Sequence, residues 1–247
     1  MSFDPTHYSP APDLLKDRII MVTGAGDGIG AEAARTYARH GATVVLVGRT
    51  QLKLEAVYDA IVAEGCPEPI ITVIDFAQAQ GDDYQAIADA IEQEFGRLDG
   101  VLHNASMLGY LSPVVHYETP KWLEVIHVNL NAPFLLTQVL LPLLQKSPDP
   151  SIVFTSSGVG RKGRALWGAY SVSKFGTEGL MEILADELND IRVNCINPGK
   201  TRTAMRRAAY PAEDPATLKT TADIMPTYLY LLGPDSQGTS GQSLDCQ

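Results

Sequence analysis

The sequence has few cysteines, few aromatic residues and a shortage of positive charge. Its 247 residues include 3 cysteines, 7% aromatic side chains, and 19 Lys and Arg against 29 Asp and Glu. Cys66, Cys195 and Cys246 are odd in number and far apart, which predicts neither a disulfide framework nor a metal site and favours a reducing cytoplasm. The formal net charge of −10 disfavours nucleic-acid and membrane-surface partners, because both are polyanions.

A long uninterrupted hydrophobic run is also missing. No stretch approaches the ~18 consecutive apolar residues that indicate a transmembrane helix. The beginning of the chain carries Asp4 and three prolines instead of the basic and then apolar regions of a secretory signal. We therefore expect residues 1–13 to form a loose arm and residues 14–247 to form a single domain, with no linker or repeat inside it.

Short apolar runs alternate along the chain with segments of helical periodicity. The expected strands are 18–23, 43–47, 70–74, 100–103, 151–155, 192–196 and 243–245. The expected helices are 28–40, 51–64, 82–95, 121–145 and 168–189. Several strands are almost wholly apolar, as in a parallel sheet that is buried on both faces. The alternation predicts an α/β fold with a doubly wound, mostly parallel seven-stranded sheet and helices on both faces.

A glycine-rich turn follows directly after the first expected strand, and a helix begins within it. Glycines let the backbone approach a pyrophosphate, and the helix N-terminus offers free N–H groups and a positive dipole. The alternative is a merely flexible turn, and the spacing T-G-x-x-x-G-x-G differs from the common G-x-G-x-x-G. The expected cofactor contacts in this turn are Gly24, Gly26, Asp27, Gly28, Ile29 and Gly30.

The end of the second expected strand carries an arginine where NAD-binding proteins usually carry an acid. The guanidinium of Arg49 can bind a 2′-phosphate that a carboxylate would repel, so NADP(H) is favoured over NAD(H). The alternative for Arg49 is a surface charge. Asp75, which ends the third strand, is a candidate partner of the adenine amino group, or else a helix cap before Phe76.

Tyr170 and Lys174 are four residues apart in an expected helix, which places a phenol beside an ammonium. A neighbouring positive charge lowers the pKa of a phenol, so we expect Tyr170 to act as a proton donor near neutral pH. The alternative is an amphipathic helix with a solvated lysine.

Together these residues resemble the classical short-chain dehydrogenase/reductase family over nearly the whole chain from Leu14. Within that family, Leu98–Asn104 and Asn197–Thr203 are similar to the bacterial YciK-type oxidoreductases. The resemblance implies a single-domain Rossmann fold and a homodimer or homotetramer. The motifs that carry it are the glycine turn, Asp75, His103-Asn104-Ala105-Ser106, Asn129, Ser157, Tyr170, Lys174 and Pro198-Gly199 with Thr203.

The resemblance also implies roles for single residues. Ser157 would bind the substrate oxygen, although Ser156 is a competing hydroxyl next to it. Tyr170 would donate or accept the proton, and Lys174 would tune Tyr170 and hold the nicotinamide ribose. Asn129 would complete the catalytic set. The resemblance extends the cofactor site to Phe76, Asn104, Ala105, Tyr170, Lys174, Pro198, Gly199, Thr201 and Thr203.

Pro133 gives an independent reason to examine Asn129. Proline has no N–H to bond the carbonyl four residues earlier, so the Asn129 carbonyl could hold a water near Lys174. The alternative is a simple kink in a long helix.

Three parts of the chain depart from the family or define the substrate. Ser106 replaces a family glycine, and we expect His103 to be a packed strand-end residue. The chain closes on 245–247 without the usual glycines, which leaves the packing there open. A substrate lid is expected at about 200–221, and its arginines, with those of the loop at 161–167, form a basic cluster. That cluster would attract an anionic substrate, or else it is solvated surface charge.

The expected function is an NADP(H)-dependent oxidoreductase that transfers a hydride between nicotinamide and a carbonyl or alcohol substrate, without a metal. One alternative is a nucleotide-binding regulatory or interaction protein on the same scaffold. Another is an epimerase or dehydratase that transfers a hydride only transiently.

Overall fold

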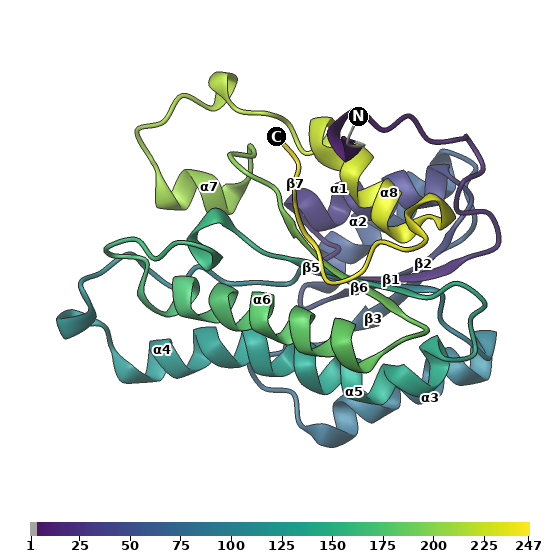
Figure 1. Ribbon diagram of the computed structural model, residues 1–247, viewed down its shortest axis with the longest axis horizontal. Helices are drawn as coiled ribbons and strands as arrows, with labels where there is room; N and C mark the ends of the chain where they lie inside the picture. The colour runs from purple at the N-terminus through teal and green to yellow at the C-terminus, as the bar shows by residue number, and fades with distance from the viewer. Residues whose placement is uncertain (1–3) are drawn as a thin grey trace.

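The computed structural model describes residues 4–247, which form a three-layered α/β domain (Figure 1). Its parallel sheet has seven strands in the order β3-β2-β1-β4-β5-β6-β7, which confirms the predicted Rossmann fold. Each expected strand is present, and every boundary lies within one residue of the prediction. The strands are β1 Ile19–Thr23, β2 Thr43–Gly48, β3 Ile70–Val73, β4 Gly100–His103, β5 Ser151–Thr155, β6 Arg192–Asn197 and β7 Ser243–Asp245.

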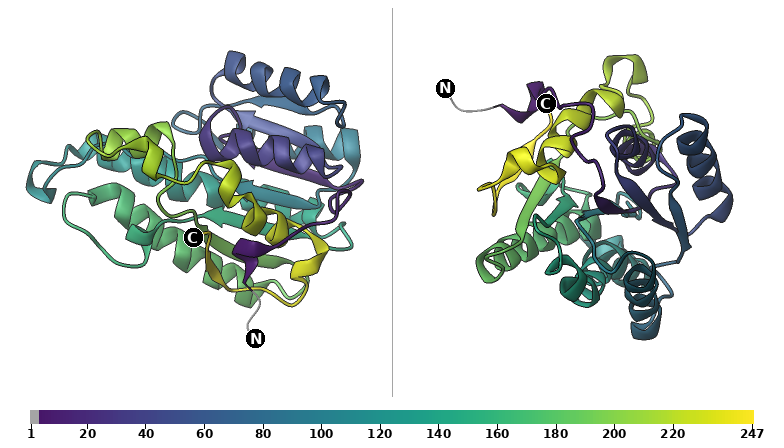
Figure 2. Two further views of the ribbon diagram at one scale, coloured as in Figure 1. Left: turned by 90° about the horizontal axis from the view of Figure 1, so that it is seen from above. Right: turned by 90° about the vertical axis from the view of Figure 1, so that its right-hand side faces the viewer.

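Helices cover both faces of the sheet (Figures 1 and 2). The buried side chains of α1, α2 and α8 form one apolar layer, and those of α3, α5 and α6 form the other. The helices are α1 Gly28–Arg39, α2 Gln51–Ala63, α3 Gly81–Phe95, α4 Thr119–Ile126, α5 Ala132–Leu144, α6 Gly168–Glu187, α7 Ala204–Ala209 and α8 Met225–Leu232. Single 3₁₀ turns lie at Pro5–His7, Val114–His116, Gly158–Gly160, Pro215–Thr217, Ala222–Ile224 and Pro234–Ser236.

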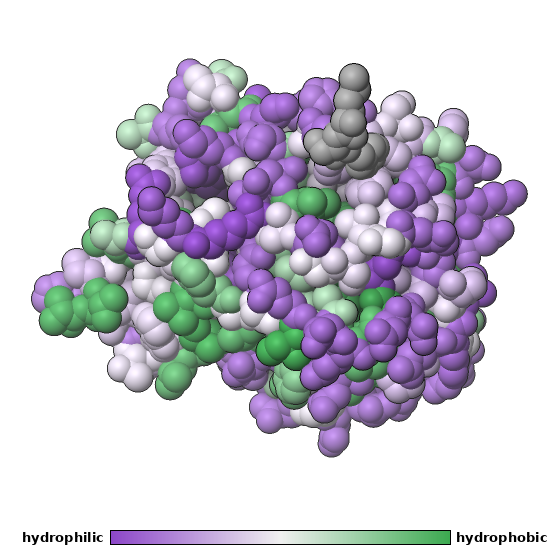
Figure 3. All heavy atoms as spheres, viewed as in Figure 1, coloured by the Kyte–Doolittle hydropathy of each residue, from purple (hydrophilic) through white to green (hydrophobic). Residues whose placement is uncertain are grey.

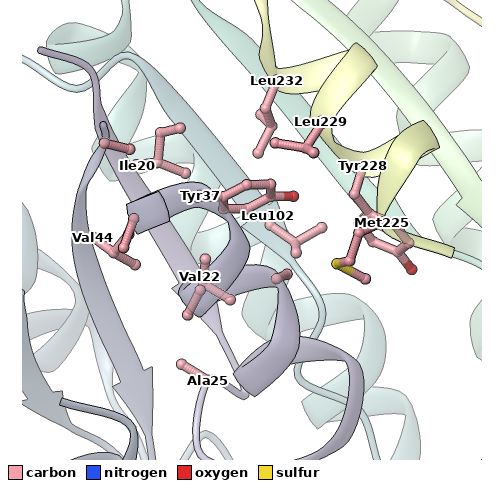
Figure 4. Close-up of a cluster of buried hydrophobic side chains, with 14 of the residues drawn as sticks. Ile20, Val22, Ala25, Tyr37, Val44, Leu102, Met225, Tyr228, Leu229 and Leu232 are labelled. Carbon is pink, nitrogen blue, oxygen red and sulfur yellow. The ribbon is translucent and has the colours of Figure 1, made fainter. Parts of the chain in front are cut away.

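The core between α1, α8 and the sheet is shown in Figure 4. Ile20 and Val22 of β1 meet Tyr37 of α1 and Tyr228 of α8, and all four are 0% exposed. Alternate residues of β1 enter this cluster and the one on the opposite face, so the strand is apolar throughout. Burial on both faces fixes the carboxyl end of β1, from which the glycine turn leaves the sheet.

The long helix expected at 121–145 is interrupted, which corrects the prediction of one continuous element. A π-helical turn at His127–Asn131 separates α4 from α5. The N–H of Ala132 bonds to the carbonyl of His127, five residues earlier, and Pro133 beside it has no N–H to donate. The helix thus accommodates the missing N–H of Pro133 by a π-helical turn rather than by a simple kink.

The stretch Thr119–Leu144 is long and apolar enough by length and composition to cross a membrane, and 39% of its 18-residue window is buried inside the protein. Core helices of globular proteins share these properties. Here α5 packs against α3, and α4 packs against α6. The composition of this stretch therefore does not by itself indicate a membrane span.

The described part of the predicted N-terminal arm lies against α8. Tyr8 donates a 2.7 Å hydrogen bond to Asp235, and its ring packs edge-on against Tyr230 at 5.5 Å. From Asp4 onward the arm is therefore held to the domain rather than loose. Its first three residues lie outside the described residues.

Candidate functional site

A cavity of about 610 Å³ lies at the carboxyl ends of the strands. β1 pairs with β2 on one side and with β4 on the other, and the chain crosses over in opposite directions from this point. Open α/β sheets bind ligands in the crevice at such a switch point. The predicted cofactor residues that line the cavity are Gly24, Gly26, Asp27, Gly28, Ile29, Arg49, Asn104, Ala105, Tyr170, Lys174, Pro198, Gly199, Thr201 and Thr203.

The glycine turn has a shape that other residues would not permit. Gly24 and Gly28 have φ angles of +68° and +55°, in the left-handed region that favours glycine. A Cβ on Gly30 would lie 2.2 Å from the carbonyl oxygen of Gly24, so this glycine lets the turn fold onto the first turn of α1. Gly30 does not line the cavity itself, but it allows the other glycines to do so.

Thr23 joins the glycine turn to the segment after β4. Its hydroxyl accepts hydrogen bonds from the N–H groups of Asn104 and Ala105, both at 3.0 Å. The side chain of Asn104 donates to the Thr23 carbonyl at 3.2 Å and accepts from the Thr155 hydroxyl at 3.3 Å. Asn104 therefore ties together the ends of β1, β4 and β5. The sequence analysis assigned no role to Thr23 or Thr155.

Positive charge gathers where β2 ends. Arg49 lines the cavity and forms no ion pair with any of residues 4–247. Lys53, in the first turn of α2, also lines the cavity and forms a 2.6 Å ion pair with Asp27 of the glycine turn. Lys53 was not predicted from the sequence, because Arg49 precedes α2 and no helical spacing relates the two residues.

Asp75 and Phe76 do not line the cavity. The Asp75 carboxylate accepts a 3.0 Å hydrogen bond from the N–H of Ala77 within a turn. The next helix, α3, begins at Gly81 with Gln80 as its N-cap, so Asp75 does not cap a helix. The ring of Phe76 is 7% exposed and stacks on Tyr84 in the core. Packing, rather than an open site, therefore accounts for Phe76.

Tyr170 and the two neighbouring serines occupy different environments. Burial raises the pKa of Tyr170 to about 12, and a hydrogen bond with the Ser157 hydroxyl acts in the opposite direction. The hydroxyl of Ser156 is instead bonded to the carboxylate of Glu178. Of the two serines, it is thus Ser157 whose hydroxyl meets the phenol. Gly160 allows this loop to press on α6, because a Cβ there would lie 2.7 Å from the Cβ of Lys174.

Lys174 is buried and bonded to the sheet. Its Nζ donates a 2.7 Å hydrogen bond to the carbonyl of Thr155 and lies 5.6 Å from the centre of the Tyr170 ring. Burial lowers the pKa of Lys174 to about 8. In the protein alone the pKa of Tyr170 is therefore raised rather than lowered, because burial dominates, and the tuning of Tyr170 by Lys174 stays a prediction.

The side chain of Asn129 holds the segment after β4 in place. Its carbonyl accepts a 2.8 Å hydrogen bond from the N–H of Met107, and its amide donates to the Met107 carbonyl at 2.9 Å and to Ser173 at 3.0 Å. The backbone carbonyl of Asn129 receives a long 3.5 Å hydrogen bond from the hydroxyl of Thr177. The water link at this oxygen stays a prediction.

The two residues that depart from the family around Asn104 differ in their surroundings. His103 stacks on Phe154 and bonds to the hydroxyl of Thr137, and burial lowers its pKa to about 3. It is packed, as expected, and neutral. Ser106 lines the cavity, and its buried hydroxyl has no protein partner within the described part of the chain.

The predicted lid follows β6 and carries α7 (Figure 1). Thr201 bridges to Lys219 across its base, and the hydroxyl of Thr203 caps α7 by accepting from the N–H of Arg206. Gln247 donates a 2.6 Å hydrogen bond to the carbonyl of Pro198, so the end of the chain packs where the lid begins.

The expected basic cluster does not form as one patch. Arg206 pairs with Glu213 at 2.6 Å, and Arg161 pairs with Asp245 at 2.7 Å. Arg164 donates to the hydroxyl of Tyr210 at 2.9 Å. These three guanidiniums already have partners, whereas Lys162, Arg202 and Arg207 form no ion pair with any of residues 4–247. No group of three or more His, Cys, Asp and Glu that could hold a metal ion occurs between residues 4 and 247.

Known proteins share this sequence and fold. The family model for short chain dehydrogenase matches residues 18–214. The chain is 55% identical to the uncharacterized oxidoreductase YciK of Escherichia coli K12 over 242 residues, which cover 98% of this chain and 96% of that protein. Two similar solved structures are of short chain dehydrogenases. One, from Shigella flexneri, is complexed with NADP (55% identity, TM-score 0.94, 96% of this chain and 100% of that one). The other, from Escherichia coli CFT073, is complexed with NADPH (56% identity, TM-score 0.95, covering 96% of this chain and 100% of that one).

Proposed function

Because this chain belongs to the short-chain dehydrogenase family of oxidoreductases, we propose that it transfers a hydride between NADP(H) and a carbonyl or alcohol substrate. One observation carries the proposal: a single cavity is lined by the glycine turn, by Arg49 and by the Tyr170–Lys174 pair. The first two suit a phosphorylated dinucleotide, and the pair suits proton transfer beside it.

The cavity fits NADP(H) at both ends of the adenine half. Gly24 and Gly30 leave a backbone cradle, since a Cβ on either would meet the turn or the segment after β4 at 3.0 Å or less. Within the described residues Arg49 has no carboxylate partner, which suits bidentate binding of a 2′-phosphate. The relatives complexed with NADP and NADPH support the same choice over NAD(H). Thr201, Thr203, Pro198 and Gly199 would contact the nicotinamide half.

When bound, NADPH supplies a hydride to the carbonyl carbon of the substrate. The phenol of Tyr170 would donate the proton that the substrate oxygen needs, and its raised pKa keeps it protonated until then. The hydroxyl of Ser157, which meets that phenol, would hold the substrate oxygen as negative charge develops on it. In the oxidative direction Tyr170 would take the proton back.

Lys174 and Asn129 would return a proton to Tyr170. The pKa of about 8 lets Lys174 release and take up protons near neutral pH. The carbonyl of Asn129, which the hydroxyl of Thr177 contacts at 3.5 Å, would hold a water between Lys174 and solvent. The nicotinamide ribose hydroxyls would bond to Lys174 and Tyr170.

The assembly and location of the protein form part of the proposal. Val172, Phe175 and Ile183 of α6 are each about half exposed, and hydrophobic residues gather over the region of α4 and α6 in Figure 3. Pairing of this face would bury them in a homodimer or homotetramer. Three unpaired cysteines suit the cytoplasm. Residues up to 13 would serve as an arm, and those at about 200–221 as a substrate lid.

The test separates an oxidoreductase from the other two functions. NADPH and NADH binding is measured by fluorescence, and a panel of aldehydes, ketones and alcohols is screened for net NADPH turnover. An oxidoreductase should bind NADPH more tightly and turn it over. Binding without turnover of any substrate would indicate a nucleotide-binding regulatory protein, and product formation without net turnover would indicate an epimerase or dehydratase. Tyr170→Phe should keep binding and lose turnover.

A further inference from the structure

Most of the positive charge that lines the cavity is already neutralised. Five cationic side chains line it: Arg49, Lys53, Lys121, Lys174 and Arg206. Lys53 is paired with Asp27, Lys121 with Glu124, and Arg206 with Glu213. Of these five cations, only Arg49 and Lys174 form no ion pair with any of residues 4–247. Neither of these lies on the lid.

The ion pair on the lid is bidentate and partly buried. Nε and Nη2 of Arg206 each donate a 2.6 Å hydrogen bond to a different carboxylate oxygen of Glu213. The side chains are 18% and 24% exposed. Arg206 also lies flat over Tyr210, with its guanidinium carbon 3.9 Å from the ring centre. The charge of Arg206 is thus shared between a carboxylate and an aromatic face before any substrate arrives.

Aromatic rings connect this ion pair to the proposed proton donor. The ring of Trp167 lies 5.6 Å from that of Tyr170 and 6.0 Å from that of Tyr210. Trp167 lines the same cavity as Tyr170. The cavity is also lined by the apolar side chains of Met107, Leu108, Met205 and Ala209, and by polar ones such as those of Ser106 and Ser156. Trp167 therefore gives the cavity an aromatic surface beside the phenol, with its ring tilted by 51° to that of Tyr170. Aromatic rings pack well against such a surface.

We infer that this half of the cavity selects uncharged carbonyl compounds that carry an apolar ring, and that Glu213 sets the selection by neutralising Arg206. The inference rests on the proposed function and refines its substrate class. It also replaces the expectation of an anionic substrate. A carboxylate placed here would have to displace Glu213 or leave its own charge uncompensated, and the buried surroundings make both costly.

Two matched pairs of compounds test this inference, and binding is measured separately from turnover. The reducible pair is benzaldehyde and 4-carboxybenzaldehyde, compared by kcat/KM with NADPH. The non-reducible pair is benzamide and 4-carbamoylbenzoate, compared by calorimetric titration of the NADP⁺-loaded protein. For the unmodified protein we expect the neutral member of each pair to be preferred by ~10-fold or more.

Glu213→Gln should release Arg206 while keeping the size of the side chain. We expect the preference for the neutral compound to fall by ~10-fold or more, mainly through tighter binding of the anionic one. Glu64→Gln is the control, because Glu64 also pairs with two arginines, but neither of them lines the cavity. It should change neither the kcat/KM ratio nor the ratio of binding constants between the neutral and the anionic compound.

The inference would be overturned if Glu213→Gln left the preference for the neutral over the anionic compound unchanged. A preference of the unmodified protein for the anionic compound would also overturn it. Binding of neither benzamide nor 4-carbamoylbenzoate would overturn it as well. Preferential binding of benzamide without reduction of any aldehyde or ketone would count against the proposed function alone.

Discussion

The Nζ of Lys174 donates a 2.7 Å hydrogen bond to the backbone carbonyl of Thr155. This bond ties the ammonium to the carboxyl end of β5, where Thr155 also bonds Asn104. Lys174 is 3% exposed, so its charge is held by one carbonyl inside the protein. The same geometry that places Lys174 in the site therefore reduces the stability of the fold.

The first prediction concerns the free energy of unfolding that is lost because the charge of Lys174 is buried. The pKa of Lys174 lies at about 8 in the folded protein, below its ordinary value of 10.5. Below pH 8 the full penalty of a buried charge applies, and it is relieved as the pH rises towards 10.5, because only the unfolded chain then holds the proton. Lys174→Met should therefore stabilise the protein by ~1–3 kcal/mol at pH 7 and by less at pH 10.

Urea denaturation of both proteins at the two pH values measures this difference. A gain in stability that is equal at pH 7 and pH 10 would show that the charge of Lys174 is not its source.

The second prediction separates the two adjacent serines. Ser157→Ala should lower kcat by ~100-fold or more, because it removes the hydroxyl proposed to hold the substrate oxygen. Ser156→Ala should have a much smaller effect on kcat, since its hydroxyl is bound to Glu178. Steady-state kinetics with any active carbonyl substrate makes the comparison. Equal losses in the two variants would contradict the assignment.

The third prediction concerns the choice between NADPH and NADH. Arg49→Gln should weaken NADPH binding by ~10- to 100-fold and leave NADH binding nearly unchanged, because a 2′-phosphate loses its charged partner. Lys53→Met should weaken NADPH binding by less, since Lys53 is paired with Asp27. Fluorescence titration gives the dissociation constants.

Arg207→Gln is the control for these variants, because Arg207 is exposed on α7 and does not line the cavity. An equal loss of NADH affinity in Arg49→Gln would mean that Arg49 supports the fold of the site instead of binding the 2′-phosphate of NADPH.

The fourth prediction uses two glycines of one loop. Gly160→Ala should destabilise the protein by ~1–3 kcal/mol and reduce turnover, because the added Cβ would lie 2.7 Å from the Cβ of Lys174. Gly163→Ala should be tolerated, since nothing lies within 4 Å of its Cβ position. Thermal unfolding measures the effect, and similar melting temperatures for the two variants would refute the proposed contact.

The strands could be predicted because burial on both faces of the sheet requires an uninterrupted apolar run, as in Val44–Val47. A short run of this kind is typical of a buried parallel strand. Tyr170 and Lys174 could be placed together because helical spacing fixes their common face. The pKa values of these residues could not be predicted from that spacing. Burial depends on what every other element packs around them, and here it outweighs the attraction between phenol and ammonium.

Contacts between elements were also out of reach of the sequence. Arg206 and Glu213 lie on either side of the end of α7, so no periodicity relates them. Lys53 meets Asp27 only because α2 packs over the glycine turn, where a Cβ on Gly26 would lie 2.9 Å from that of Lys53. Asp75 could be a cap or a ligand from its position alone, and its hydrogen bond to Ala77 is a local backbone contact.

The position of β1 has a consequence for the order in which the protein folds. Ile20 of β1 pairs with Gly100 of β4, far along the chain, whereas β1 and β2 pair across a single helix. Closing the longer loop costs more chain entropy and is slower. The turn at Gly24 meets Asn104 only after that closure. The proposed nucleotide site, formed by the glycine turn and the segment after β4, would therefore be completed late during synthesis. Acquisition of cofactor affinity by a growing or refolding chain would then report that its two half-sheets have joined.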